Sequence, residues 1–214
     1  MMVIVRSEKE GDFAAIRDIN LRAFEQEDEA ALVEALRESS FFVPELSLIA
    51  IVDDETAGHI MFTRSRIQTS HENFPALTLA PMAVLPEYQN QGIGSKLVDE
   101  GLNESRRLGY RIVTVVGHPE YYWRFGFIPA GAAGLQCPFP VPDEAFMVLE
   151  LTAGALNGVS GMVVYPPEFG ATDTGSGAGS SSGPFSPGSW RYWRILRRSG
   201  WLLPPGLHLY PPSS

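Results

Sequence analysis

The feature that most constrains this chain of 214 residues is an apolar strand that leads, through two closely spaced glycines, directly into a helix. The strand is predicted over Leu77–Val84 and the helix over Ile93–Leu108. Gly92 and Gly94 let the backbone approach a ligand, and the free N–H groups of the first helical turn point toward that ligand. Together with the helix dipole, these groups predict an anion site that is best suited to a pyrophosphate.

Two common phosphate-binding motifs do not fit this turn, and an ordinary tight turn between strand and helix is the plain alternative. The dinucleotide fingerprint requires a third glycine, and Leu97 stands at that position. A P-loop requires Gly-Lys-Ser/Thr, whereas the order here is Gly94-Ser95-Lys96. If the turn binds an anion, the ligand is therefore a different nucleotide-linked anion.

The elements around this segment predict an α/β fold with a mixed, mostly antiparallel sheet and helices on both faces. Asp53-Asp54-Glu55 forms the turn of a hairpin, and the one β-α-β crossover comes later in the chain. Hairpins followed by a single crossover exclude a doubly wound parallel sheet. The strands are expected at Val3–Val5, Leu46–Val52, Ala57–Gln68, Leu77–Val84, Arg111–Val116 and Phe146–Leu151, and the helices at Glu10–Glu25, Asp28–Glu38, Ile93–Leu108 and Glu120–Phe125.

Composition divides the chain into a domain at 1–171 and an extension at 172–214. Thr172 to Ser189 is rich in Gly, Ser and Pro, which predicts a flexible linker. The basic, aromatic tail that follows is expected to be disordered. A short amphipathic helix at Trp190 to Arg198, in contact with a membrane surface or a partner, is the less favoured alternative.

Charge and composition limit the class of protein. The net charge is −9, and since the extension holds four Arg and one Asp, residues 1–171 carry −12, which disfavours binding to nucleic acid. No apolar run reaches the roughly 20 residues that span a bilayer, so no transmembrane segment is expected. A lone cysteine, Cys137, which we interpret as a small buried side chain, predicts a reducing, cytoplasmic compartment. The four scattered histidines predict no metal site, and His59 is expected to be structural.

Two motifs then give the chain a specific resemblance. Gln89-x-x-Gly92-x-Gly94 after a strand resembles the acetyl-CoA motif of the GNAT superfamily of N-acetyltransferases. About 30 residues later, Tyr121–Phe127 (YYWRFGF) is similar to the second signature of that superfamily, and a strand separates the two. The segments 117–122 and 137–146 resemble a bacterial subgroup of predicted acetyltransferases, whose members commonly have Asp where this chain has His118.

The resemblance implies that the co-substrate is acetyl-CoA. In this superfamily two parallel strands splay apart and the pantetheine arm lies in the gap, with the pyrophosphate on the turn before the helix. A metal is not implied. The residues that the resemblance assigns to acetyl-CoA are Met82, Ala83, Val84, Gln89, Asn90, Gln91, Gly92, Ile93, Gly94, Ser95 and Lys96.

The resemblance also implies direct attack of an amine on the thioester, without a nucleophilic side chain. A backbone N–H near Met82 is expected to bind the oxyanion. The matching position for the proton donor is Tyr122, with Tyr121 as the second choice. The general base stays unassigned, because deprotonation through water is equally consistent. Glu45, Glu87, His118 and Glu120 are candidates by rough proximity only.

The expected acceptor is therefore a small-molecule or peptide amine, and nucleic acid is disfavoured. The alternative is a non-catalytic acyl-CoA-binding or interaction module with the same fold. A binding module does not need a proton donor beside the thiol, so Tyr122 is the residue that separates the two hypotheses.

Overall fold

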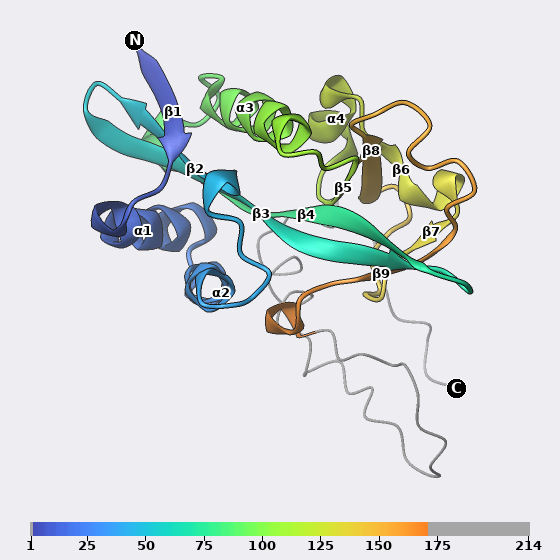
Figure 1. The fold of residues 1–214 in the computed structure, drawn as a ribbon. Coiled ribbons are helices and arrows are strands. Elements are labelled where there is room, and N and C mark those ends of the chain that lie inside the picture. The colour runs from blue at the N-terminus through green and yellow to red at the C-terminus, as the bar shows by residue number, and fades with distance from the viewer. Residues whose placement is uncertain (1, 171–214) are drawn as a thin grey trace, which may run out of the picture.

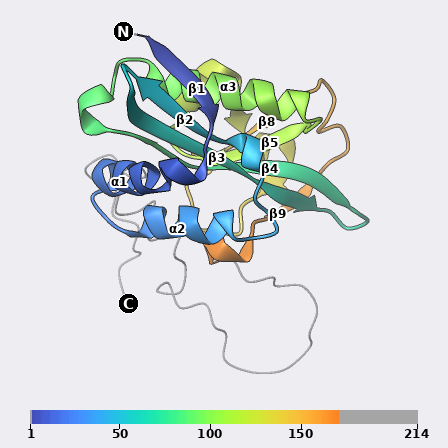
Figure 2. The ribbon, with the colours of Figure 1, turned by 60° about the vertical axis from the view of Figure 1, so that its left-hand side comes forward.

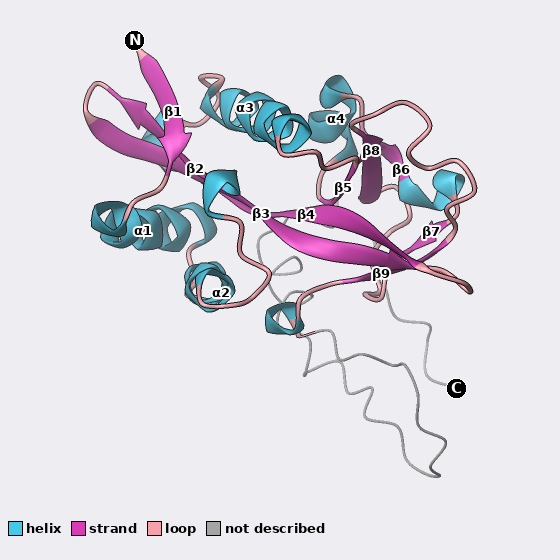
Figure 3. Ribbon diagram, in the orientation of Figure 1, coloured by secondary structure: helices cyan, strands magenta, loops and turns pink. Residues whose placement is uncertain are grey.

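The computed structural model describes residues 2–170, which form one mixed sheet with helices on both faces (Figures 1 and 3). The predicted linker and tail at 172–214 lie outside the described residues. The helices are α1 (Phe13–Phe24), α2 (Asp28–Arg37), α3 (Ile93–Arg107) and α4 (Pro119–Tyr122). The strands are β1 (Val3–Ser7), β2 (Ser47–Val52), β3 (Glu55–Gln68), β4 (Asn73–Val84), β5 (Ile112–Val116), β6 (Ile128–Pro129), β7 (Leu135–Gln136), β8 (Phe146–Glu150) and β9 (Gly161–Val164).

The sheet confirms the predicted fold class. Its main order is β1-β2-β3-β4-β5-β8-β6, while β9 pairs with β3 and with β7. The β4–β5 and β7–β9 pairs are parallel, and the other pairs among the described strands are antiparallel. The sequence did not predict β6, β7 and β9, because strands of two to four residues are too short to show a period.

The helices cover the sheet as two layers: α1 and α2 lie on one face, and α3 and α4 on the other (Figures 1 and 2). Successive side chains of β3 point to opposite faces of the sheet and pack against both helical layers. Ile60 and Phe62 pack with the α3 side chains, whereas Met61 packs with those of α1 and α2. Both faces of the central strands are therefore buried, which explains their nearly continuous apolar character.

The two parallel central strands separate partway along their length. Strand β4 pairs with β5 only over Leu77–Leu79, yet β4 continues to Val84. Its pairing with β3 shifts register at the same point, where Ala80 and Pro81 stand opposite a single residue of β3. Proline has no N–H to donate to a neighbour. Within residues 2–170, the last five residues of β4 consequently have no partner on the β5 side, and the splayed pair is present as predicted.

No helix in the described part of the chain is long and apolar enough to cross a membrane.

Candidate active site

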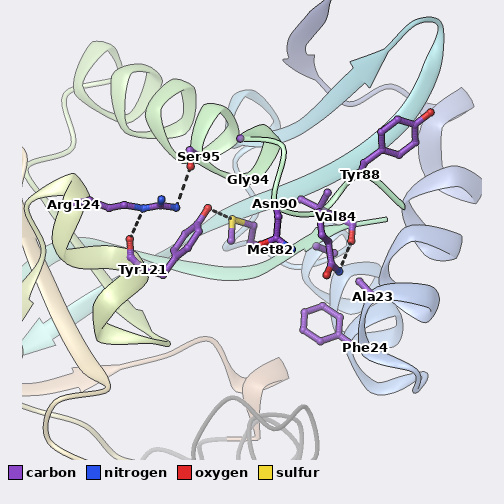
Figure 4. A pocket seen from close by; sticks show the side chains of 13 residues that line it. Ala23, Phe24, Met82, Val84, Tyr88, Asn90, Gly94, Ser95, Tyr121 and Arg124 are labelled. Carbon is purple, nitrogen blue, oxygen red and sulfur yellow. Dashed lines mark hydrogen bonds between the residues drawn. The ribbon is translucent and has the colours of Figure 1, made fainter. Parts of the chain in front are cut away.

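A cavity of about 510 Å³ lies where β4 separates from β5, between the end of α1 and the start of α3 (Figure 4). The C-terminal half of β4, the glycine turn and the segment after β5 all contribute to its wall. The lining residues are Ala23, Phe24, Met82, Ala83, Val84, Tyr88, Gln89, Asn90, Gly92, Gly94, Ser95, Tyr121 and Arg124. Eight of the eleven residues that the sequence assigned to acetyl-CoA are among them.

The turn between β4 and α3 is built to leave the helix N-terminus open. Asn90 (φ 59°) and Gly92 (φ 85°) adopt left-handed conformations, which bring the chain round onto the first turn of α3. Gln89 closes the turn from outside by donating from Nε2 to the Val84 carbonyl at 3.0 Å. Helix α3 has no side-chain cap and no acid in its first turn, so its first N–H groups remain available to an anion.

The other three predicted cofactor residues do not line this cavity. Ile93 is buried in the core beneath α3. Gln91 folds back to donate from Nε2 to the Glu87 carbonyl at 2.8 Å. The Lys96 ammonium donates to the carbonyl of Val3 on β1, away from the cavity. Lys96, which the resemblance assigned to acetyl-CoA, therefore does not bring its positive charge to the cavity.

Arg124 supplies that charge. Its side chain is exposed and lies across the mouth of the cavity, where its Nη2 donates to Ser95 Oγ at 3.0 Å and its Nε to the Tyr121 carbonyl at 3.0 Å (Figure 4). Among the described residues, Arg124 is the only cationic side chain that lines the cavity. The sequence analysis missed it, although it lies within the YYWRFGF signature.

The two adjacent tyrosines occupy different environments. Tyr121 lines the cavity, and its hydroxyl points to Met82 Sδ at 3.9 Å (Figure 4). Tyr122 is 3% exposed and packs against Phe127, with ring centroids 5.6 Å apart. The structure thus brings Tyr121, rather than Tyr122, to the cavity wall.

Gly94 connects the two signature motifs physically. A Cβ added at Gly94 would lie 2.7 Å from the Tyr121 hydroxyl, so any larger residue would displace the tyrosine. Burial raises the pKa of Tyr121, which keeps its hydroxyl protonated at neutral pH. The cavity therefore combines an open helix N-terminus with a protonated hydroxyl.

None of the four rough candidates for a general base lines this cavity. Glu87 pairs with Arg22 at 2.7 Å on the surface, and Glu45 lines a separate hollow beside β1 and α3. Cys137 does not line the cavity, and burial raises the pKa of its thiol to about 12, which disfavours the thiolate that a nucleophile requires. Within residues 2–170, no group of three or more His, Cys, Asp and Glu side chains could hold a metal.

The fold and the cavity together are those of an acyltransferase that uses an acyl-CoA: a splayed parallel pair, a glycine turn at a helix N-terminus and a tyrosine hydroxyl beside the gap. The family comparison agrees, because residues 4–130 match the model of the acetyltransferase (GNAT) domain family. The chain belongs to this family. It is an acetyl-CoA-dependent acyltransferase.

Two relatives align with most of this chain. The uncharacterised N-acetyltransferase YhbS of Escherichia coli K12 is 37% identical over 168 residues, which cover 78% of this chain and 98% of YhbS. The uncharacterised N-acetyltransferase YjhQ of the same strain is 40% identical over 146 residues, which cover 66% of this chain and 81% of YjhQ.

Two similar proteins have been solved in complex with CoA or acetyl-CoA. The crystal structure of E. coli YhbS in complex with CoA superposes with a TM-score of 0.73 at 36% identity, and covers 78% of this chain and 91% of that one. A GNAT acetyltransferase from Brucella melitensis in complex with acetyl-CoA gives a TM-score of 0.64 at 30% identity, and covers 78% and 98%. CoA and acetyl-CoA are the ligands of these neighbours, and acetyl-CoA is the co-substrate of the family.

Proposed function

We propose that this protein transfers the acetyl group of acetyl-CoA to an amine by direct attack. The observation that carries the proposal is the edge of β4 that is not paired with β5, from Ala80 to Val84: its last three residues line the same cavity as the open N-terminus of α3. An extended pantetheine arm can pair with that edge as a further strand would. Its pyrophosphate then reaches the N–H groups of Gly92, Gly94 and Ser95.

The chemical step needs little from the protein beyond positioning and charge stabilisation. The amine nitrogen attacks the thioester carbonyl carbon, and a backbone N–H near Met82 stabilises the oxyanion that forms. The C–S bond then breaks to give the amide and the CoA thiolate. The proton that the amine loses passes to solvent, since no base is assigned.

Tyr121 is our proposed proton donor to the departing thiolate, in place of Tyr122. Its hydroxyl lies on the cavity wall beside Met82 on β4, where a thiol in the gap would lie. Its raised pKa favours the protonated form that a donor requires. The buried Tyr122 packs against Tyr121 edge-on, with the two ring centroids 5.0 Å apart, and so supports its position.

The acceptor is proposed to be a small-molecule or peptide amine rather than a nucleic acid. The charge of −12 on residues 1–171 repels phosphates and attracts cationic acceptors over distances of about a Debye length. A screen of small amines, amino acids, aminoglycosides and peptide N-termini, followed by release of free thiol from acetyl-CoA, tests this proposal. Binding of CoA without any thiol release would favour the non-catalytic module instead.

Calorimetry on a matched pair of glycine variants tests the binding site itself. Gly92→Asp places a negative charge at the N-terminus of α3, whereas Gly109→Asp places the same side chain just beyond its C-terminus. Both glycines have φ 85°, and both would have nothing within 4 Å of an added Cβ. We expect Gly92→Asp to weaken CoA binding at least about tenfold, because the new carboxylate repels the pyrophosphate at the helix N-terminus. Gly109→Asp should change the affinity less than about twofold. Unchanged affinity in folded Gly92→Asp would exclude the turn as the site.

A second pair, Tyr121→Phe and Tyr122→Phe, tests the proton donor. We expect Tyr121→Phe to lower kcat by about 10²–10⁴-fold with little change in CoA affinity, and Tyr122→Phe to retain most of the rate. The reverse order of effects would return the role to Tyr122.

A further inference from the structure

Arg124 connects the two functional parts of the cavity. It follows α4 in a short 3-10 turn (Trp123–Phe125) that ends at Gly126 (φ 91°). From there its guanidinium reaches Ser95 in the first turn of α3, and it also stacks over the Tyr121 ring with Cζ 4.3 Å from the centroid (Figure 4). One side chain thus contacts both the anion-binding turn and the proposed proton donor.

The guanidinium keeps donors for a further ligand. Its two hydrogen bonds, to the Ser95 hydroxyl and the Tyr121 carbonyl, use one N–H of Nη2 and the N–H of Nε. Three of the five N–H groups of an arginine remain. Neither protein partner is charged, so the positive charge is not neutralised by these contacts. The planar arrangement of the remaining donors matches the oxygens of a phosphate.

The surrounding charge makes this cation important for an anionic ligand. Residues 1–171 carry −12, and Arg124 is the one cationic side chain on the cavity wall in the described part of the chain. Dipole and backbone N–H groups at α3 attract an anion only locally, within about one helical turn. A phosphate at Ser95 would lie within reach of the Arg124 donors.

We infer that Arg124 is a phosphate-binding residue for acetyl-CoA, and that this contact fixes the turn that holds Tyr121 over the gap; the inference rests on the proposed function. Binding at the phosphate end of acetyl-CoA is thereby coupled to positioning at its thioester end. Arg124 acts on catalysis through Tyr121 and is in that respect a positioning residue. Its position beside Ser95 indicates the pyrophosphate, rather than the 3′-phosphate, as the group that it binds.

Truncated ligands test the binding half of this inference without an acceptor. Calorimetry compares wild-type, Arg124→Gln, Arg124→Lys and the control Arg107→Gln, which changes an exposed arginine in the last turn of α3. The ligands are CoA, dephospho-CoA, which lacks the 3′-phosphate, and pantetheine, which has no phosphate. We expect Arg124→Gln to weaken CoA and dephospho-CoA about 10–100-fold, as for a hydrogen bond between charged groups, and to leave pantetheine unchanged. Arg124→Lys should recover part of the loss.

The possible results distinguish which phosphate Arg124 contacts and whether it contacts one at all. A loss with CoA but not with dephospho-CoA would move the contact to the 3′-phosphate, and overturn the assignment to the pyrophosphate. Equal losses with CoA and pantetheine would mean that Arg124 only holds the turn. Wild-type protein that does not bind CoA would overturn the proposed function, whereas equal binding by wild-type and Arg124→Gln would overturn only the role of Arg124.

Kinetics with acetyl-CoA and acetyl-pantetheine test the positioning half. For the wild-type protein we expect a higher kcat with acetyl-CoA, since only that substrate engages Arg124 through a phosphate. Arg124→Gln should lower kcat with saturating acetyl-CoA by a larger factor than it lowers kcat with acetyl-pantetheine, because only acetyl-CoA loses a phosphate contact as well. The same fractional loss of kcat with both substrates would overturn the coupling.

Discussion

Two arginines of this protein make similar contacts with aromatic rings and yet differ in every other respect. Arg37 stacks over Phe13 at 3.8 Å, as Arg124 stacks over Tyr121 at 4.3 Å. Arg37 is mostly buried and makes a bidentate pair with the Glu8 carboxylate, at 2.7 and 3.1 Å. Arg124 is exposed, and its hydrogen-bond partners in the described part of the chain are a hydroxyl and a carbonyl. An arginine that is paired with a carboxylate stabilises the fold, whereas an arginine at a cavity wall without an acidic partner can bind an anionic ligand.

The partners of Arg37 extend into a closed polar cluster that joins α2, β2, β3 and the residue that follows β1. Ser47 Oγ donates to Glu8 at 2.7 Å and lies 3.0 Å from His59 Nε2. Because the Ser47 proton is used on Glu8, we assign the His59 proton to Nε2, from which it donates to Ser47. Ser47 and His59 are fully buried, so this Ser-His-Glu arrangement has no access for a substrate. His59 is structural, as the sequence analysis predicted.

The largest expected effect comes from breaking the buried pair. Arg37→Gln should lower the free energy of unfolding by about 3–5 kcal/mol, because it leaves the Glu8 carboxylate buried without its cation. The control is Arg22→Gln, which breaks the exposed pair with Glu87 and should cost less than about 1 kcal/mol. Urea unfolding of both variants measures the difference. Equal losses would mean that burial does not separate the two pairs.

Acid titration of stability gives the next largest effect. Burial of Glu8 raises its pKa, but the hydrogen bonds with His59, Arg37 and Ser47 outweigh burial and lower the pKa to about 2. A carboxyl with a lowered pKa in the folded state stabilises the protein above its unfolded pKa of about 4.5, and this contribution is lost as the pH falls toward 2. We expect the contribution to be about 2 kcal/mol after solvent screening is allowed for.

Glu8→Gln is the variant that isolates this contribution. It should be less stable than wild type at pH 6 and should lose less stability between pH 4.5 and 2. Parallel curves for the two proteins in urea unfolding across that range would contradict the assignment.

A buried acid without a cation should respond to pH in the opposite direction. Burial raises the pKa of Glu29 to about 7, and its described partner is the amide of Gln26. A raised pKa means that the stabilising contribution is complete below about 4.5 and is lost as the pH rises through 7. Glu29→Gln should therefore gain about 1–2 kcal/mol relative to wild type between pH 5 and pH 8. Glu34→Gln, an exposed acid of the same helix, is the control and should show no such gain.

The smallest expected effect completes the comparison of the two arginines. Arg124→Gln should change the free energy of unfolding by less than about 1 kcal/mol, because the side chain is exposed and no buried charge depends on it. Urea unfolding in the absence of CoA measures this value. A loss as large as that of Arg37→Gln would show that Arg124 belongs to the framework of the fold.

The sequence by itself determined the order of the main elements and the position of the glycine turn before α3. These properties are local: the apolar period defines each strand or helix, and a glycine at positive φ defines where the chain turns. Eight of the predicted cofactor residues line the cavity for this reason, because they follow one another from Met82 to Ser95 around a single turn.

Only the tertiary structure decided which neighbouring side chains face the cavity. Tyr121 and Tyr122 are adjacent in sequence, and the packing of Tyr122 against Gly117 and Phe127 turns Tyr121 outward. Lys96 and Arg124 are both cations near the turn. The Lys96 ammonium donates to a carbonyl of β1, whereas the side chain that contacts Ser95 is that of Arg124, 29 residues later in the chain. The closed cluster of Glu8, Arg37, Ser47 and His59 joins residues that are distant in sequence, so no local pattern could indicate it. Long-range packing, rather than residue type, assigns such side chains their roles.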